Sequence, residues 1–157
     1  YNPYGNPGHW RDSMYAARKR DDAQAILKFA ALVMDSNYLD IDAHMLSGYA
    51  CNKTGDKDGF ERHRWIAKKL VQSIFDSGTG KTPEYAFFLI SVDEQHTILN
   101  LMGLRVISKS MVEREGKQFS LVQAIDPNDN DKKLSIYFNL DTPIKWLREN
   151  SRMPKAG

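Results

Sequence analysis

The 157 residues of this chain suit one domain, or two small units that share a core, and that length needs neither disulfides nor a metal ion to hold its core. The formal net charge of +2 is small and evenly spread, which argues against nucleic acid or an anionic membrane as a partner. Cys51 is the only cysteine, so no intramolecular disulfide is possible, and no apolar run approaches the ~20 residues of a membrane span.

The first part of the chain places apolar residues at helical spacing. Tyr1–Gly8 is rich in proline, glycine and asparagine and is not expected to be helical. A helical region is predicted from Asp12 or Ser13 to about Ser36. Within it, Arg18–Asp22 is predicted to form a turn, because its basic residues suit the end of one helix and its acidic residues the start of the next.

Two further helices are predicted before residue 78. Asp40 suits the N-cap of a helix over about 41–53, and Gly55 suits the left-handed position that ends it. A longer helix is predicted over about 58–76. Its inward stripe consists of Phe60, His63, Ala67, Leu70, Val71 and Ile74.

These two helices resemble one tetratricopeptide repeat. That motif requires small residues where two antiparallel helices touch, here Gly48 and Ala67, and a turn glycine between them, here Gly55. The tryptophan, the leucine and the closing proline of the consensus are missing. The resemblance implies a degenerate, tetratricopeptide-like helical region over residues 1–77.

Ser77–Val92 is predicted to join the helical half to a sheet half. Within it, Tyr85–Val92 is apolar enough for a buried strand, although the apolar run alone does not exclude a helix. Asp93 is predicted to cap a short helix that ends at Gly103. The residues that follow alternate between apolar and polar over 104–114, 119–125 and 134–140, which predicts three strands.

The turns between these strands favour antiparallel neighbours. Glu115-Gly116 is predicted to form a hairpin turn, and 126–131 a longer turn-rich loop. Asp141 is predicted to begin a last helix with Pro143 in its first turn. Its apolar face would consist of Ile144, Trp146 and Leu147.

The predicted fold class is therefore α+β. Tetratricopeptide-like helical hairpins (1–77) would pack on a small, mostly antiparallel sheet of three or four strands with two further helices (78–157), and the two regions would form one compact unit.

Gly80-Lys81-Thr82 looks like the end of a phosphate-binding loop. Such a loop needs a glycine five residues before Gly80, where this chain has Phe75, and it must lead from a strand into a helix. Here the order is helix to strand, and Pro83 blocks helix entry at once. A structural linker without ATP binding is expected.

The remaining candidates for chemistry are sparse. None of the four histidines forms a metal-ligand pair by spacing, and Cys51 lacks the surroundings of a nucleophile, so no catalytic, metal or cofactor site is predicted. Five residues of the long helix form a candidate partner-binding surface: Arg62, Arg64, Trp65, Lys68 and Lys69. The alternative for the charged residues is an ordinary solvated helix face.

Several segments together resemble a known family: Phe75–Phe87, Leu89–Val92, Ile98–Leu104 and Ile136–Asp141, with the opening Tyr1–Tyr4. They look like the bacterial domain-of-unknown-function family numbered 4919. The resemblance implies helical repeats that lead into a small α+β unit, and often an exported protein, so export is favoured over the cytoplasm. An N-terminal segment is expected to have preceded Tyr1. The family supplies no established activity or catalytic residues.

Three functions fit these observations. The favoured one is a non-enzymatic protein-binding module whose partner is another protein. A specific version is an immunity protein that neutralises a secreted bacterial toxin. The rival is a small hydrolase or ligand-binding enzyme built on the sheet, with Tyr137, Asn139, Asp141 and His96 as its polar groups.

Overall fold

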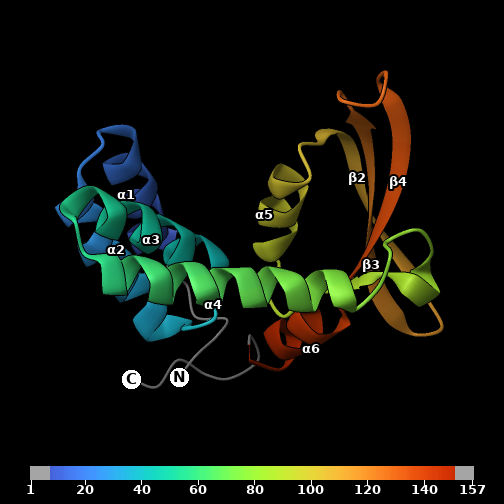
Figure 1. Ribbon diagram of the computed structural model, residues 1–157. Helices are drawn as coiled ribbons and strands as arrows, with labels where there is room; N and C mark the ends of the chain where they lie inside the picture. The colour runs from blue at the N-terminus through green and yellow to red at the C-terminus, as the bar shows by residue number, and fades with distance from the viewer. Residues whose placement is uncertain (1–7, 151–157) are drawn as a thin grey trace. The chain divides into compact units, whose positions relative to one another are not determined.

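The computed structural model describes residues 8–150. The chain divides into two compact units, here called the helical unit (residues 1–72) and the sheet unit (residues 73–157), whereas the sequence suggested a boundary after Ser77. The helical unit contains α1 (Gly8–Lys19), α2 (Ala23–Ser36), α3 (Ile41–Thr54) and most of α4 (Lys57–Asp76) (Figure 1). The sheet unit follows with η1 (Pro83–Tyr85), β1 (Phe87–Phe88), α5 (Glu94–Leu101), β2 (Arg105–Arg114), β3 (Lys117–Asp126), β4 (Lys132–Asn139) and α6 (Asp141–Asn150). The α+β prediction is confirmed.

The helix boundaries follow the capping signals of the sequence. Asp22 and Asp40 begin α2 and α3, each accepting a hydrogen bond from the backbone N–H three residues later. Gly55 ends α3 in the left-handed conformation with φ of 80°. The predictions for Asp40, Gly55 and the turn before α2 are confirmed.

The start of α1 differs from the prediction. The helix begins at Gly8, which was expected to be non-helical, rather than at Asp12 or Ser13; residues 1–7 lie outside the described part of the chain. An earlier start is favourable because Met14 is fully buried and the Trp10 ring, one turn before it, stacks on Phe29 with centroids 6.1 Å apart. Packing against α2 thus outweighs the weak helix propensity of the opening residues.

The core of the helical unit lies between α1, α2 and α3. One cluster of fully buried side chains contains Met14, Ala30, Val33 and Ala43, and a second contains Ala17, Ile26 and Ala50. Alanine recurs on all three helices, so their backbones approach closely, and the larger residues fill the space between them.

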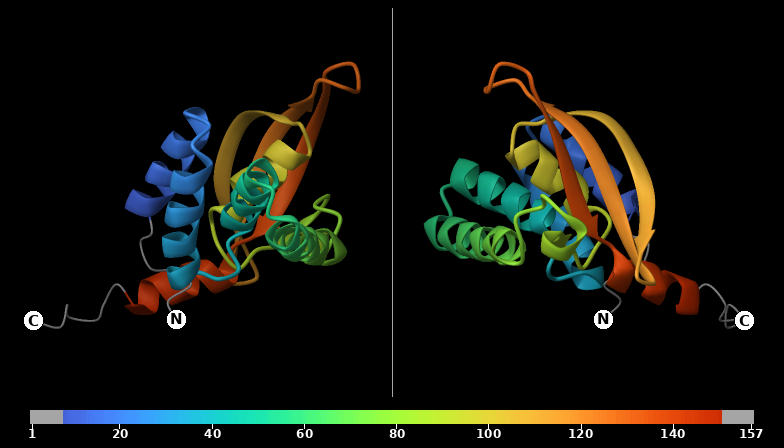
Figure 2. Two further views of the ribbon diagram at one scale, coloured as in Figure 1. Left: turned by 60° about the vertical axis from the view of Figure 1, so that its left-hand side comes forward. Right: turned by 90° about the vertical axis from the view of Figure 1, so that its right-hand side faces the viewer.

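The sheet has the strand order β1-β4-β3-β2. Figure 2 shows its three long strands, β2, β3 and β4, side by side. β2, β3 and β4 pair as an antiparallel meander, as predicted, and β1 adds a parallel edge next to β4. Glu115 and Gly116 form the predicted hairpin turn with φ of 51° and 73°, the sign that a two-residue hairpin requires. Ile136 and Phe138 of β4, and Leu140 just after it, are buried.

The strand predicted within Tyr85–Val92 is present but confined to Phe87–Phe88. Beyond them, the N–H groups of Ile90 and Ser91 donate to the Glu94 carboxylate at 2.8 and 3.1 Å. In a strand these N–H groups would donate to the carbonyl groups of a neighbouring strand. Asp93 takes the N-cap position predicted for it, but its side chain makes no capping hydrogen bond.

Both remaining helices of the sheet unit follow their predicted positions. α5 packs on the face of β3 that carries Ser120, since Gln95 Nε2 donates to Ser120 Oγ at 2.6 Å. α6 begins at Asp141, and Pro143 in its first turn is buried. Its predicted apolar face is wrong at Leu147, which is exposed, while Ile144 is half-buried and the Trp146 side chain lies outside what is described.

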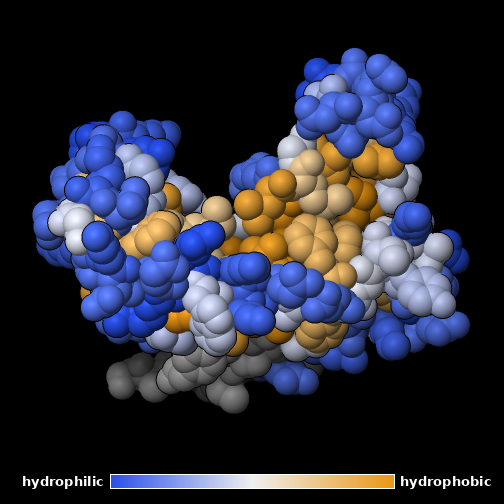
Figure 3. Space-filling model, viewed as in Figure 1, coloured by the Kyte–Doolittle hydropathy of each residue, from blue (hydrophilic) through white to orange (hydrophobic). Residues whose placement is uncertain are grey.

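Apolar side chains also reach the surface of the sheet unit. On the face shown in Figure 3 they gather over α5 and the neighbouring end of the sheet. Leu101 at the end of α5, and Val106 and Ile107 near the start of β2, are exposed. β2 is the edge strand on this side. A register shift near Ile107 and the charged residues Arg105 and Lys109 limit its pairing with other strands.

Candidate functional site

The outer face of α4 carries the five residues proposed for partner binding. All are exposed: Arg62, Arg64, Trp65, Lys68 and Lys69. Trp65 keeps 62% of its surface open to solvent. At ~100° per residue, it lies on the opposite side of the helix from the buried Ala67 and Ile74. Helix geometry therefore brings these residues together on one outward face, called the α4 face below.

The α4 face combines aromatic surface with positive charge. Lys69 Nζ lies 6.0 Å from the centre of the Trp65 ring, at the limit of a cation–π contact. Arg64 Nη1 lies 3.5 Å from the carboxylate of Glu61, and its guanidinium lies 5.9 Å from the Phe60 ring. Within residues 61–69, Glu61 is the one acidic residue beside four cations, so this part of the face is positive on balance.

Two glycines lie where α4 packs on α3, and an added Cβ atom would be tolerated at Gly48 but not at Gly59. A Cβ atom at Gly48 of α3 would lie 3.7 Å from His63 Cβ and 3.8 Å from Arg64 N. At Gly59 it would lie only 2.7 Å from Cys51 Sγ, so no side chain fits there. The contact at Gly48 is of the kind expected of a tetratricopeptide repeat; that resemblance itself stays a prediction.

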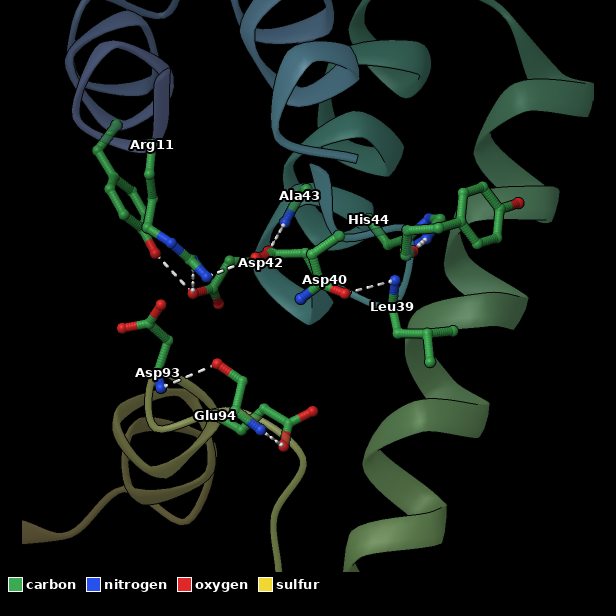
Figure 4. Close-up of polar contacts among 12 residues, drawn as sticks. Arg11, Leu39, Asp40, Asp42, Ala43, His44, Asp93 and Glu94 are labelled. Carbon is green, nitrogen blue, oxygen red and sulfur yellow. Dashed lines mark hydrogen bonds and ion pairs between the residues drawn. The ribbon is translucent and has the colours of Figure 1, made fainter. Parts of the chain in front are cut away.

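A polar cluster ties α1 to the start of α3 (Figure 4). Arg11 donates to Asp40 at 2.5 Å and to Asp42 at 3.1 Å, and the Tyr15 hydroxyl donates to Asp42 at 2.6 Å. The Asp40 side chain is only 1% exposed, and its other oxygen caps α3 by accepting from Ala43 N at 2.9 Å. Burial and the neighbouring Asp42 raise the pKa of Tyr15 above its ordinary value, so the hydroxyl stays a donor.

Two histidine rings meet between α3 and α4. His44 is fully buried, with Nε2 2.7 Å from the carbonyl oxygen of Tyr38 and Nδ1 2.9 Å from Nδ1 of His63. A carbonyl can only accept, so Nε2 of His44 carries the proton, and a neutral His44 accepts at Nδ1 from His63. Charging both rings would place two N–H groups and two positive charges against each other.

The surroundings of this pair also favour the neutral rings. Burial lowers the pKa of both histidines below 6.5, and the positive charge of Arg62 acts in the same direction on each. His63 is further disfavoured as a cation by His44, while Asp56 opposes this by raising the His63 pKa. The net direction is downward for both.

This pair predicts a loss of stability in mild acid. Because the folded-state pKa values lie below the unfolded value of 6.5, the unfolded chain binds more protons as the pH falls below 6.5. The pair therefore does not reduce the free energy of unfolding above that pH, and the free energy of unfolding declines as the pH falls below it. Urea unfolding followed by circular dichroism at pH 7.5 and 5.0 measures the decline.

Two variants test whether the histidine pair causes the decline. His63→Gln keeps an amide donor for His44 but cannot be charged, so the loss between pH 7.5 and 5.0 should shrink. His96→Gln removes an exposed histidine on α5 and should leave the loss unchanged. An equal loss in wild type and in His63→Gln would contradict the assignment.

The sheet unit contains a hollow of about 830 Å³ beside its hairpin turn. Nine residues line it: Pro83, Glu84, Glu113, Arg114, Glu115, Lys117, Phe119, Tyr137 and Asn139. They come from η1, from the β2–β3 hairpin and from β4. The hollow is therefore formed by segments that lie far apart in the sequence.

The hollow collects two of the four polar residues on which an enzyme was expected to depend. Tyr137 and Asn139 line it, whereas Asp141 and His96 do not. Asp141 binds Lys145 at 2.7 Å, and that contact holds the pKa of the Asp141 carboxyl below its usual value. His96 is exposed on α5.

Gly80 lies in a tight turn whose backbone groups are already occupied. The N–H groups of Thr79 and Gly80 both donate to the carbonyl oxygen of Tyr85, at 2.9 and 2.7 Å, and Tyr137 N donates to Gly80 O. The segment leads into η1, which has three residues. These amides are not available to wrap a phosphate, which agrees with the structural-linker prediction.

Neither a metal cluster nor a membrane helix is found in the described part of the chain. Among residues 8–150, no three histidine, cysteine, aspartate or glutamate side chains are placed to hold a metal ion. Among those same residues, no helix is both long and apolar enough to cross a membrane.

Sequence reasoning missed the histidine pair and the hollow. His44 and His63 are both on inward positions, but nothing in their spacing shows which rings touch across two helices. The hairpin turn at Glu115-Gly116 was predicted, yet its position beside η1 depends on the sheet register.

Comparison with known proteins identifies one family. The family model described as "Domain of unknown function (DUF4919)" matches residues 1–149. No curated protein matches the chain, and no solved structure does.

Proposed function

The chain belongs to the DUF4919 family, and from this premise we propose that it is a non-enzymatic protein-binding module of a bacterial protein. The α4 face binds the partner. One observation carries this proposal: Trp65 stands 62% exposed at the centre of a positively charged helix face.

Trp65 is the residue that a solvated helix face does not explain. Lysine and arginine on an outward face need no partner, but a tryptophan there leaves a large apolar ring in water. Tryptophan and arginine are also the residues that most often dominate binding energy at protein interfaces. A partner that covered Trp65 would bury the ring and the alkyl stems of Lys68 and Lys69 together.

The charge of the α4 face defines the partner. Arg62, Arg64, Lys68 and Lys69 surround Trp65, and Glu61 is engaged by Arg64. An acidic protein surface with an apolar group at its centre complements this arrangement. If the chain is an immunity protein, the acidic partner is a secreted bacterial toxin, and the toxin binds at the same α4 face.

The rival proposal, a small hydrolase or ligand-binding enzyme, has one observation in its favour. Tyr137 and Asn139 come together in the hollow of the sheet unit. The hollow could bind a ligand without catalysing a reaction. Such binding would be compatible with a protein-binding role for the α4 face.

Trp65→Ala is expected to weaken partner binding by about 2 kcal/mol or more, roughly thirtyfold, because the ring is a central anchor. The measurement has two steps. The tagged chain and the variant are used in parallel to capture proteins from the native cells, and mass spectrometry identifies what only the wild type retains. The affinity of that protein for both chains is then measured by calorimetry.

A charge-matched pair of variants provides the control. Lys68→Glu/Lys69→Glu reverses two charges on the α4 face and should abolish binding at low salt. Lys132→Glu/Lys133→Glu makes the same change in net charge on β4 and should bind as wild type does. A partner retained equally by wild type, Trp65→Ala and Lys68→Glu/Lys69→Glu would refute the use of this face. A retained toxin whose activity the chain blocks would support the immunity version.

A further inference from the structure

We propose that the hollow between η1 and the β2–β3 hairpin binds a short zwitterionic peptide. Its carboxylate would lie against Arg114 and Lys117, and its ammonium groups against the glutamates of the walls. This site is separate from the α4 face and would add a small ligand to the proposed protein partner.

Charges of both signs converge on the hollow. Glu84 stands on η1, while Glu113, Arg114, Glu115 and Lys117 belong to the hairpin. Four of the five charged residues lie around one hairpin turn, and the fold brings the carboxylate of Glu84 beside them from η1.

These charges do not neutralise one another by contact. Among the described residues, no ion pair of 4.0 Å or less involves Glu84, Arg114, Glu115 or Lys117. Glu113 accepts one hydrogen bond, from Gln118 Nε2 at 2.6 Å, and keeps acceptor capacity on its carboxylate. A ligand that carries both charges would complete the pairs that the side chains leave open.

Glu84 and Arg114 both line the hollow and interact electrostatically. The Thr82 hydroxyl, the backbone N–H of Glu84 itself and the positive charge of Arg114 keep the pKa of the Glu84 carboxyl below its ordinary value. Glu84 is therefore a carboxylate at neutral pH, close enough to sense Arg114 and too far to form a direct ion pair. A molecule between them can bind both.

The size and floor of the hollow select the class of ligand. About 830 Å³ lies within the ~300–1,000 Å³ of ordinary ligand pockets and exceeds what one free amino acid fills. Phe119 and Tyr137 supply aromatic surface, and Asn139 supplies an amide that can pair with a peptide group. A peptide of a few residues with a charge at each end meets these conditions together.

The test titrates the ¹⁵N-labelled chain with two ligands of matched size. The tripeptide Lys-Ala-Glu with free termini should give saturable amide shifts at Glu84, at 113–119 and at 137–139. The blocked, uncharged analogue acetyl-Gln-Ala-Gln-amide should give none at the same concentrations. Glu84→Gln and Arg114→Gln each remove one charged contact with the peptide. Each variant should therefore bind the tripeptide about tenfold or more weakly than wild type.

Controls separate this proposal from the α4 face. Lys132→Gln removes a charge elsewhere on β4 and should bind the tripeptide as wild type does. Trp65→Ala should also bind it normally, so loss of the protein partner leaves this result intact. Amide spectra of each variant show whether it remains folded.

Three outcomes would overturn the proposal. Shifts of equal size with the charged tripeptide and with its uncharged analogue would show that charge is not recognised. Saturable shifts at these residues with chitotetraose alone would assign the hollow to an oligosaccharide. If the shifts do not saturate at about 10 mM tripeptide, binding is too weak to be meaningful, and the hollow is not a peptide site.

Discussion

Gly78→Ala is expected to lower the free energy of unfolding by about 3 kcal/mol, although it adds a single methyl group. A Cβ atom at this position would lie 2.4 Å from the carbonyl oxygen of Tyr85 and 2.6 Å from that of Ala86. Both obstacles are backbone atoms, so no side-chain rotation relieves the clash. The turn must therefore open. Overpacking costs about 1–3 kcal/mol of stability, and each lost hydrogen bond to Tyr85 O costs about 1 kcal/mol more.

Gly116→Ala is the matched control. Gly116 has φ of 73° and no atom within 4 Å of an added Cβ, so alanine there meets conformational strain without a clash. Its expected cost is about 1 kcal/mol. Urea unfolding followed by circular dichroism ranks the two variants. Equal costs would mean that the contact with Tyr85 O does not constrain the turn.

Asp40→Ala is expected to cost about 3–5 kcal/mol, because it removes one partner of a buried ion pair. The Asp40 side chain is 1% exposed and accepts from Arg11 at 2.5 Å and from Ala43 N at 2.9 Å. Its loss leaves the half-buried guanidinium with one fewer carboxylate and uncaps α3. Thermal and urea unfolding both measure the change.

Asp22→Ala separates the two roles of Asp40. Asp22 caps α2 by the same kind of bond, to Ala25 N at 3.0 Å, but it is exposed. Removing it should cost about 1 kcal/mol, the ordinary value of an N-cap. The difference between the two variants is then the contribution of the buried pair with Arg11. If both variants cost the same, the pair with Arg11 contributes nothing measurable.

The helices and the hairpin were predictable because their signals are local. Asp22, Asp40 and Gly55 act within one turn of their own position, and Glu115-Gly116 needs only its two flanking strands. β1 was not predictable in the same way. It consists of two residues whose only strand partner is β4, through Phe87↔Phe138 and Phe88↔Asn139, so its extent is decided by a strand some fifty residues away.

The start of α5 shows a second limit of local reasoning. The sequence predicts Asp93 as the N-cap residue, but it does not predict that the Asp93 side chain makes no capping hydrogen bond. Nor does it predict that the Glu94 carboxylate accepts from the N–H groups of Ile90 and Ser91, because that contact depends on how the chain turns before α5.

The two candidate sites differ in the same way. The α4 face was found from the sequence, since five residues on one side of a helix follow from its period alone. The hollow was not found, because Glu84, Arg114 and Tyr137 belong to three segments that only the sheet register brings together.

Cys51 gives this chain a built-in reporter of local opening. It is the only cysteine in the sequence, and it is buried where α3 meets Gly59 of α4. Burial first, and then Asp56, raise the pKa of its thiol, so the reactive thiolate is scarce while the helices stay together. A thiol reagent therefore reacts faster the more often this helix pair opens. Labelling of Cys51 in the wild-type protein can thus follow the opening of α3 from α4 as the pH is lowered and His44 and His63 take up protons.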